Sequence, residues 1–204
     1  MTCTVHLIRH GSHDLLGRVL LGRGDVALSP QGQAEAEAVA AALADAGLTA
    51  LISSPRTRAR QTAAPIAARA GLPIVIDPDI DEIDLGEWSG ASFETLRQDA
   101  HWRSFNAQRA WALVPGGETM LAVQGRAVAA MQRLHQQHPN GTLAVVSHSD
   151  VIKAIVMHVL GVPLDLIHRF EIAPASCSTI LLDDSGCMVE RINMPAGRQR
   201  GDKR

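Results

Sequence analysis

The stretch TVHLIRHG, residues 4–11, decides the fold because it runs from a buried strand straight into reactive side chains. Residues 4–8 are mostly apolar and β-branched, which is typical of a strand inside a sheet. Similar short runs follow at 50–52, 73–76 and 142–147, with longer alanine-rich helical runs between them. This alternation predicts an α/β fold, a three-layer α/β/α sandwich with a mostly parallel central sheet.

Capping and stop signals place the helices. Ser29-Pro30 predicts the start of a helix that Gly47 ends, since serine caps helices and proline is tolerated in the first turn. Ser54 is predicted to cap a second helix that ends at Gly71, and Pro65 inside it favours a kink or a break. The remaining predicted elements are helices at 92–108, 118–138 and 150–160 and strands at 178–182 and 188–192.

Length and composition indicate a single globular domain. The chain has 204 residues, of which 46% are hydrophobic and 20% are charged, enough to bury one core. We expect the domain to span 1–194, with an inserted helical segment at about 91–138. Residues 195–204 are polar and basic, which favours a disordered tail.

Composition also excludes several classes of function. A net charge of −2 gives no electrostatic basis for nucleic-acid binding, and 3% aromatic residues offer little for stacking on bases or sugars. The longest apolar run, residues 38–44, is too short for a membrane span, which needs about 20 residues. Three cysteines without metal or redox spacing, and an amino terminus without signal-peptide character, favour a cytoplasmic protein. The sequence leaves a homodimer open.

Reactive side chains follow three of the predicted strands, as RHG at 9–11, SSPRTR at 53–58 and SHS at 147–149. The carboxyl ends of parallel strands share one rim of a sheet, where ligands bind. Two histidines and at least two arginines are therefore expected to converge there. Helices beginning at Ser54 and near Ser149 would direct free N–H groups at the same place, which favours an anion.

These residue types suit phosphoryl transfer to a histidine. Arginine forks bind phosphate, and the surrounding positive charge favours neutral imidazole, which is a nucleophile. The acidic loop at 79–84 offers a proton donor for the leaving oxygen. A metal site built from His6, His10 and His13 is disfavoured because Arg9 would repel a cation, so we predict no metal and no other cofactor.

Five motifs follow one another along the chain, namely LIRHG (7–11), SSPRTRARQTA (53–63), DEIDLGEWSG (81–90), PGGET (115–119) and VVSHSDVI (145–152). In this order they resemble the histidine phosphatase superfamily, the phosphoglycerate mutase-like family. RHG alone is a weak signal, whereas five ordered motifs are a specific one. The resemblance covers about residues 4–182 and implies the fold of that family.

The resemblance implies a role for each matching residue. His10 corresponds to the nucleophile that becomes phosphorylated, and Arg9 and Arg58 correspond to the clamp on the phosphate. His148 corresponds to a second histidine, which stabilises the transferred phosphoryl group. Gly11 is counted with the phosphate-binding residues. The other two arginines of the second motif, at 56 and 60, are expected to be solvated.

Glu82 corresponds to the proton donor, since it stands four residues before Gly86 as the family's donor stands before its glycine. Asp81 and Asp84 are acidic rivals in the same loop, and spacing alone does not choose a general acid. Glu118 in the fourth motif either reaches the pocket or caps the helix that follows it.

Several positions depart from the family's pattern. Leu16 stands where many members have an asparagine near the phosphate, and His13 either replaces that contact or belongs to the substrate mouth. Ser149 replaces the usual glycine after the second histidine and keeps its N–H for phosphate. Arg23, within LGRGD at 21–25, resembles a residue on the substrate side of the family's site and is a candidate contact to a second anionic group.

The leading interpretation is a metal-independent phosphatase that hydrolyses a small phosphorylated metabolite through a phosphohistidine at His10. The alternative is a phosphomutase of the phosphoglycerate mutase type, although glycolytic mutases of the family carry a longer insertion before the second histidine. A non-catalytic phosphate-binding domain ranks below both because His10, the arginines and Glu82 are all present. The rings of His101, Trp102 and Trp111 either line the substrate mouth or pack the inserted helices.

Overall fold

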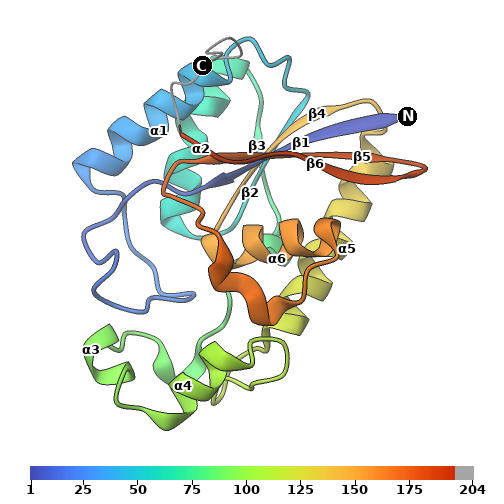
Figure 1. Ribbon diagram of the computed structural model, residues 1–204. Helices are drawn as coiled ribbons and strands as arrows, with labels where there is room; N and C mark the ends of the chain where they lie inside the picture. The colour runs from blue at the N-terminus through green and yellow to red at the C-terminus, as the bar shows by residue number, and fades with distance from the viewer. Residues whose placement is uncertain (196–204) are drawn as a thin grey trace, which may run out of the picture.

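The computed structural model describes residues 1–195 and has the predicted α/β architecture, with one mixed and mostly parallel sheet. The sheet order is β3-β2-β4-β1-β5-β6 (Figure 1). The first four strands of this order run parallel, whereas β5 is antiparallel to both β1 and β6. Residues 196–204, most of the predicted tail, lie outside the described residues. The strands are β1 (Thr2–Arg9), β2 (Ala50–Ser53), β3 (Ile74–Ile76), β4 (Thr142–Ser147), β5 (Cys177–Asp183) and β6 (Gly186–Met194).

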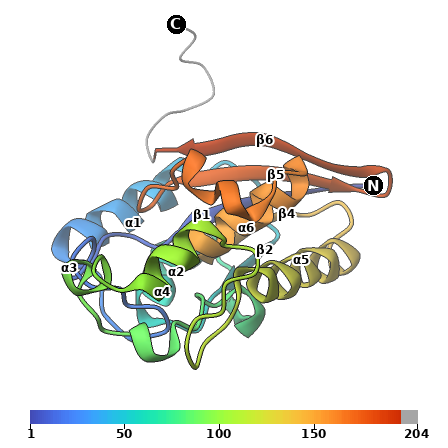
Figure 2. The same ribbon diagram turned by 60° about the horizontal axis from the view of Figure 1, so that its bottom comes forward.

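Helices cover both faces of the sheet, as Figures 1 and 2 show. Side chains of a strand point alternately to its two faces, and β1 supplies apolar residues to both. Ile8 joins the core beneath the first helix pair, and Val5 and Leu7 join the core beneath the second. The first pair is α1 (Pro30–Ala42) and α2 (Thr57–Ala70), and the second is α5 (Met120–Gln137) and α6 (Ser149–Leu160).

The predicted helical segment at 91–138 divides into two parts. Its second part, α5, belongs to the layer on the sheet, while its first part lies apart from the sheet (Figure 1). The single helix predicted over 92–108 is two helices, because Asp99 begins a new one by accepting the N–H of His101 at 2.7 Å. These are α3 (Phe93–Leu96) and α4 (Ala100–Ala107), and the short 3₁₀ turns are η1 (Pro78–Ile80), η2 (Gly86–Trp88) and η3 (Leu164–Arg169).

The second helix, α2, begins at Thr57, later than predicted. Arg56 occupies its cap position, so the expectation that Ser54 caps it is wrong. Asp25 supplies the cap from a distant loop, because its carboxylate accepts the N–H of Thr57 at 2.9 Å and the hydroxyl at 2.7 Å. That N–H group is therefore not free for a ligand. Of the kink or break expected at Pro65, the break does not occur, since α2 continues through this residue.

The start of α1 touches the loop after His10 through two glycines. Gly32 lies in the first turn of α1, where an added Cβ would overlap the carbonyl oxygen of Ser12. Gly11 is equally constrained, since a Cβ there would lie 2.6 Å from the Gly32 oxygen. This backbone contact positions α1 against the residues that follow His10.

We expect Gly32→Ala to lower the free energy of unfolding by about 1–3 kcal/mol, because the Ser12 carbonyl must move. Gly125→Ala is the matched control, since Gly125 lies on the exposed side of α5 with nothing within 4 Å of an added Cβ. The control should raise the free energy of unfolding by about 0.4–1 kcal/mol. Urea unfolding followed by circular dichroism measures both, and equal effects would contradict the close contact.

Candidate active site

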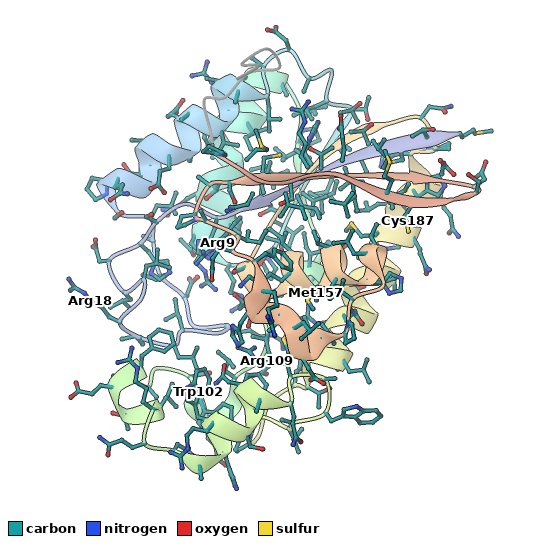
Figure 3. All side chains as sticks on the ribbon, viewed as in Figure 1. Arg9, Arg18, Trp102, Arg109, Met157 and Cys187 are labelled. Carbon is teal, nitrogen blue, oxygen red and sulfur yellow. The ribbon has the colours of Figure 1, made fainter. Side chains whose placement is uncertain are left out.

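Pairing of β1 with β4 brings two histidines together. Arg9 is in register with Ser147, so His10 and His148 follow neighbouring strand ends. Their ring centroids lie 5.2 Å apart, and both rings are buried. Figure 3 shows Arg9 at the same place, where β1 runs into the loop that follows it.

A cavity of about 370 Å³ opens beside these residues. Most of the residues predicted for the site line it, whereas Gly11, Arg23 and His148 do not. The N–H of Gly11 donates instead to Thr62 Oγ1 at 3.0 Å. His148 instead contacts Arg58, which lines the cavity. The ionisable and polar lining consists of Arg9, His10, His13, Arg58, Glu82, Ser149 and Asp150.

The tautomer of His10 follows from its hydrogen bond. Nδ1 lies 2.8 Å from the carbonyl oxygen of Gly11, which only accepts, so Nδ1 carries the hydrogen. The lone pair of the neutral ring is therefore on Nε2. Burial, and then the charges of Arg58 and Arg9, hold the pKa of His10 well below its ordinary value, so the ring is a neutral base.

His148 takes the opposite tautomer. Arg58 Nη2 lies 3.2 Å from its Nδ1, and because a guanidinium only donates, Nδ1 accepts and Nε2 carries the hydrogen. Nε2 donates to Ser54 Oγ at 2.7 Å. Burial, followed by the Arg58 charge, keeps the pKa of His148 well below its ordinary value.

A buried carboxylate behind Ser54 fixes this arrangement. Ser54 Oγ donates to Asp81 Oδ1 at 3.0 Å, and Arg56 holds the same carboxylate through Nε at 3.0 Å and Nη2 at 2.8 Å. Asp81, a rival for proton donor in the sequence, thus orients His148 through a serine. The expectation that Arg56 is solvated is wrong, because it is half-buried on Asp81, whereas Arg60 is exposed as predicted.

Both cavity arginines retain unpaired donors. Arg58 donates to the carbonyl oxygens of Gly22 and Gly24 at 2.8 and 2.7 Å, and Arg9 donates to that of Ile172 at 2.6 Å. Their Nε atoms are buried without an acceptor among the described residues. Both guanidinium groups belong to residues that line the cavity, and phosphate matches the fork geometry of a guanidinium.

Glu82 has the electrostatics of a proton donor. Burial, and then the neighbouring Asp150 charge, raise its pKa to about 7, against the opposing charge of Arg58. Its Oε2 lies 3.8 Å from His148 Nδ1. At neutral pH the carboxyl group therefore exists in both protonation states, as a group that gives and then takes a proton requires.

Asp150 and Arg109 are site residues that the sequence analysis missed. Arg109 Nη1 lies 3.0 Å from Asp150 Oδ2, and its guanidinium carbon lies 4.2 Å from the centre of the Phe105 ring. Burial alone would raise the pKa of Asp150, but the Arg109 charge holds it below its ordinary value. Asp150 follows the SHS motif directly, which is a weak signal, whereas Arg109 comes from a segment without a motif.

Arg23 and Glu118 hold the Glu82 loop without lining the cavity. Arg23 Nε donates to the carbonyl oxygen of Glu82 at 3.0 Å, while its Nη2 lies 3.0 Å from Glu118 and its Nη1 3.4 Å from Asp84. Glu118 neither lines the cavity nor caps α5, since Thr119 is the cap. This network positions the loop.

His13 lines the cavity beside His10, with ring centroids 5.6 Å apart. Burial, then the charges of Arg58 and Arg9, lower its pKa to about 4, and its buried Nδ1 has no partner among residues 1–195. The rings of His101, Trp102 and Trp111 do not line this cavity. Trp102 packs on Trp88 with centroids 5.4 Å apart, as a packing anchor does, and Trp111 is 78% exposed.

Within the described part of the chain, no group of three or more His, Cys, Asp or Glu side chains is arranged to hold a metal ion. None of its helices combines the length and apolarity that crossing a membrane requires.

The chain belongs to the histidine phosphatase superfamily (branch 1), whose family model matches residues 5–195. Phosphoserine phosphatase 1 of Hydrogenobacter thermophilus is 30% identical over 92% of this chain and 90% of that protein. A probable phosphoglycerate mutase, GpmB of Erwinia tasmaniensis, is also 30% identical, over 86% of this chain and 83% of its own length. Membership of the superfamily is thus established, and both kinds of enzyme are represented among the relatives.

Solved structures share the fold. YhfR of Bacillus stearothermophilus superimposes with a TM-score of 0.89 at 26% identity, covering 94% of this chain and 97% of that one. The chain spans about half the length, 48%, of the mycobacterial relatives that it matches at 33% identity, which include bifunctional protein Rv2228c of Mycobacterium tuberculosis.

Removing the serine behind His148 should change the environment of one ring nitrogen. In Ser54→Ala the Nε2 hydrogen loses its acceptor, a bond worth about 1 kcal/mol, while Arg58 still donates to Nδ1, so the Nε2–H tautomer should persist and mainly the Nε2 signal should shift. Imidazole ¹⁵N chemical shifts at neutral pH report the tautomer. Ser53→Ala is the matched control, because the hydroxyl of Ser53 is equally buried but donates to the Ser54 carbonyl. A wild-type His148 with its hydrogen on Nδ1 would refute the assignment.

Proposed function

We propose that this chain is a metal-independent phosphatase, which hydrolyses a small phosphomonoester through a phosphohistidine at His10. The proposal rests on the protonation states of two side chains that line the same cavity. His10 is neutral with its lone pair on Nε2, and Glu82 has a pKa of about 7. A nucleophile and a general acid are thereby available together at neutral pH.

In the first step Nε2 of His10 forms a bond to phosphorus while the bond from phosphorus to the alcohol oxygen breaks. Arg9 and Arg58, which line the cavity, bind the phosphoryl oxygens. The leaving oxygen takes the proton of Glu82, so the alcohol departs neutral. The Gly11 carbonyl, which accepts from His10 Nδ1, stabilises the positive charge that the ring acquires.

In the second step water attacks phosphorus, and the Glu82 carboxylate takes a proton from that water. The bond from phosphorus to Nε2 breaks, which releases inorganic phosphate and restores the neutral ring. His148 accepts a hydrogen bond from Arg58, and we assign it to holding that guanidinium in place beside the phosphoryl group in both steps. Each step leaves Glu82 in the protonation state that the next one needs.

A phosphomutase is the alternative, and the similarity to a probable phosphoglycerate mutase favours it. A mutase of that type passes the phosphoryl group to a second hydroxyl of an anionic substrate. Analysis of the products separates the two functions, since a phosphatase releases inorganic phosphate and a mutase yields an isomeric ester.

His10→Ala should lower phosphate release from p-nitrophenyl phosphate by about 10³-fold or more, because it removes the nucleophile. The assay contains EDTA, since the proposed reaction needs no metal. A wild-type enzyme incubated with labelled substrate and quenched should carry acid-labile phosphate, which the variant lacks. His101→Ala, an exposed histidine away from the cavity, is the control. His10→Ala activity within tenfold of wild type would remove His10 as the nucleophile.

Glu82→Gln should slow hydrolysis of benzyl phosphate by about 10²–10⁴-fold, because the departing alkoxide needs a proton. p-Nitrophenyl phosphate, whose leaving group departs as a stable anion, should lose much less in kcat. The wild-type kcat on benzyl phosphate should fall as the pH rises above about 7, where Glu82 loses its proton.

Glu87→Gln is the control for this comparison, because Glu87 lies in the same loop but is exposed and does not line the cavity. Equal losses on both esters in Glu82→Gln would argue against Glu82 as the proton donor.

A further inference from the structure

The residues that line the cavity beside His10 fall into two sets of different chemistry, which we call its two halves. One half holds Arg9, Arg58 and the histidines, where the phosphoryl group is proposed to bind. The other half is lined by apolar side chains. They come from two separate stretches of the chain, residues 16–22 and 83–93. Its aliphatic and aromatic lining consists of Leu16, Val19, Leu20, Leu21, Ile83, Leu85 and Phe93.

The apolar half is held together by backbone bonds between the stretches that form it. Leu20 donates its N–H to the carbonyl oxygen of Ala91 at 2.9 Å and accepts the N–H of Gly90 at 2.8 Å. Val19 and Ser92 form an antiparallel bridge beside this pair. Phe93 donates its N–H to the carbonyl oxygen of Arg18 at 3.2 Å, so the wall is a small two-stranded structure.

The positively charged residues that line the cavity within the described chain are Arg9 and Arg58, both in the phosphate half. Arg23 is occupied by Glu118 and Asp84 and lies outside the lining. Figure 3 shows Arg18 at the outer edge of its loop, directed away from Arg9. A second phosphate or a carboxylate on the leaving group would therefore lose water without gaining a charge partner.

A cationic leaving group would also lack an unpaired residue of opposite charge in the cavity. Glu82 also lines the cavity, but it must be protonated to serve the leaving alcohol. Asp150 is then the anionic candidate on the lining, and Arg109 already holds it at 3.0 Å. The Arg109 guanidinium is buried and stacked 4.2 Å from the Phe105 ring, so it is fixed in place. An ammonium group at Asp150 would have to compete with that guanidinium.

We infer that the alcohol released by this enzyme is uncharged and largely apolar, so the substrate class is phosphomonoesters of aliphatic or aromatic alcohols. This inference rests on the proposed phosphatase function. The cavity volume of about 370 Å³ lies near the lower end of the range of about 300–1,000 Å³ for ligand sites. It suits a phosphoryl group with an alcohol of about the size of one ring.

Three esters of primary alcohols test the inference, because their leaving oxygens are chemically similar. Benzyl phosphate has an uncharged apolar alcohol, 3-phosphoglycerate an anionic one and phosphoethanolamine a cationic one. We expect kcat/KM for benzyl phosphate to exceed the other two values by about tenfold or more, since only its alcohol gains from burial. An equal or higher value for either charged ester would overturn the inference.

Hydrolysis of p-nitrophenyl phosphate distinguishes a wrong substrate class from a wrong proposed function. If it is hydrolysed in a His10-dependent way while a charged ester is preferred, only the substrate class is wrong. If no ester, p-nitrophenyl phosphate included, releases phosphate, the phosphatase proposal falls and the inference with it.

A charge introduced into the apolar half tests whether the alcohol of the substrate binds there. Leu16→Arg should narrow the preference for benzyl phosphate over 3-phosphoglycerate by about tenfold, since it supplies a cation on the lining. Leu15→Arg is the matched control, because the adjacent Leu15 is exposed and does not line the cavity, and it should leave the ratio unchanged. An unchanged ratio in Leu16→Arg, with p-nitrophenyl phosphate turnover retained, would contradict binding of the alcohol beside Leu16.

Discussion

The parallel pairing of β1 with β4 is the constraint on which the rest of the site depends. Register places Arg9 opposite Ser147, and the chain then leaves both strands through a histidine. A slip of one residue would turn these side chains to the other face of the sheet. Apolar residues on both faces of β1 prevent such a slip, since Leu7 and Ile8 belong to opposite cores. The packing of the sheet thus sets the distance between the two rings.

The buried hydrogen bonds beside the two histidines all run in one direction, from donor to acceptor. Arg58 donates to His148, His148 to Ser54, and Ser54 to the carboxylate of Asp81. Each donor in this series of hydrogen bonds has either one hydrogen or a fixed positive charge. Reversing one hydrogen bond would therefore leave another atom of the series unpaired. The low pKa of His10 and the raised pKa of Glu82 share the same origin, which is burial in a cavity whose charges are already placed.

The sequence predicted the sheet, the two histidines and the arginines beside them, because strand ends and helix signals are local patterns. The role of Ser54 was misassigned, since Ser-Pro before a helical run is a typical cap and nothing local reveals that Asp25 takes that place. Arg109 could not be predicted, because it meets Asp150 across 41 residues. The apolar half of the cavity was missed for a related reason. Leu20 and Phe93 are ordinary core residues in sequence, and only the bridge between their stretches turns them toward the site.

Arg58 has two sets of neighbours, and this couples the two halves of the cavity. Its guanidinium faces the phosphate half, yet it also holds the carbonyl oxygens of Gly22 and Gly24, in the loop that carries Leu20 and Leu21. An anion that draws on Arg58 therefore acts on the loop that encloses the alcohol. The binding free energies of phosphate alone and of the alcohol alone should therefore not sum to that of the intact ester. Both fragments act on Arg58, so their contributions are not independent.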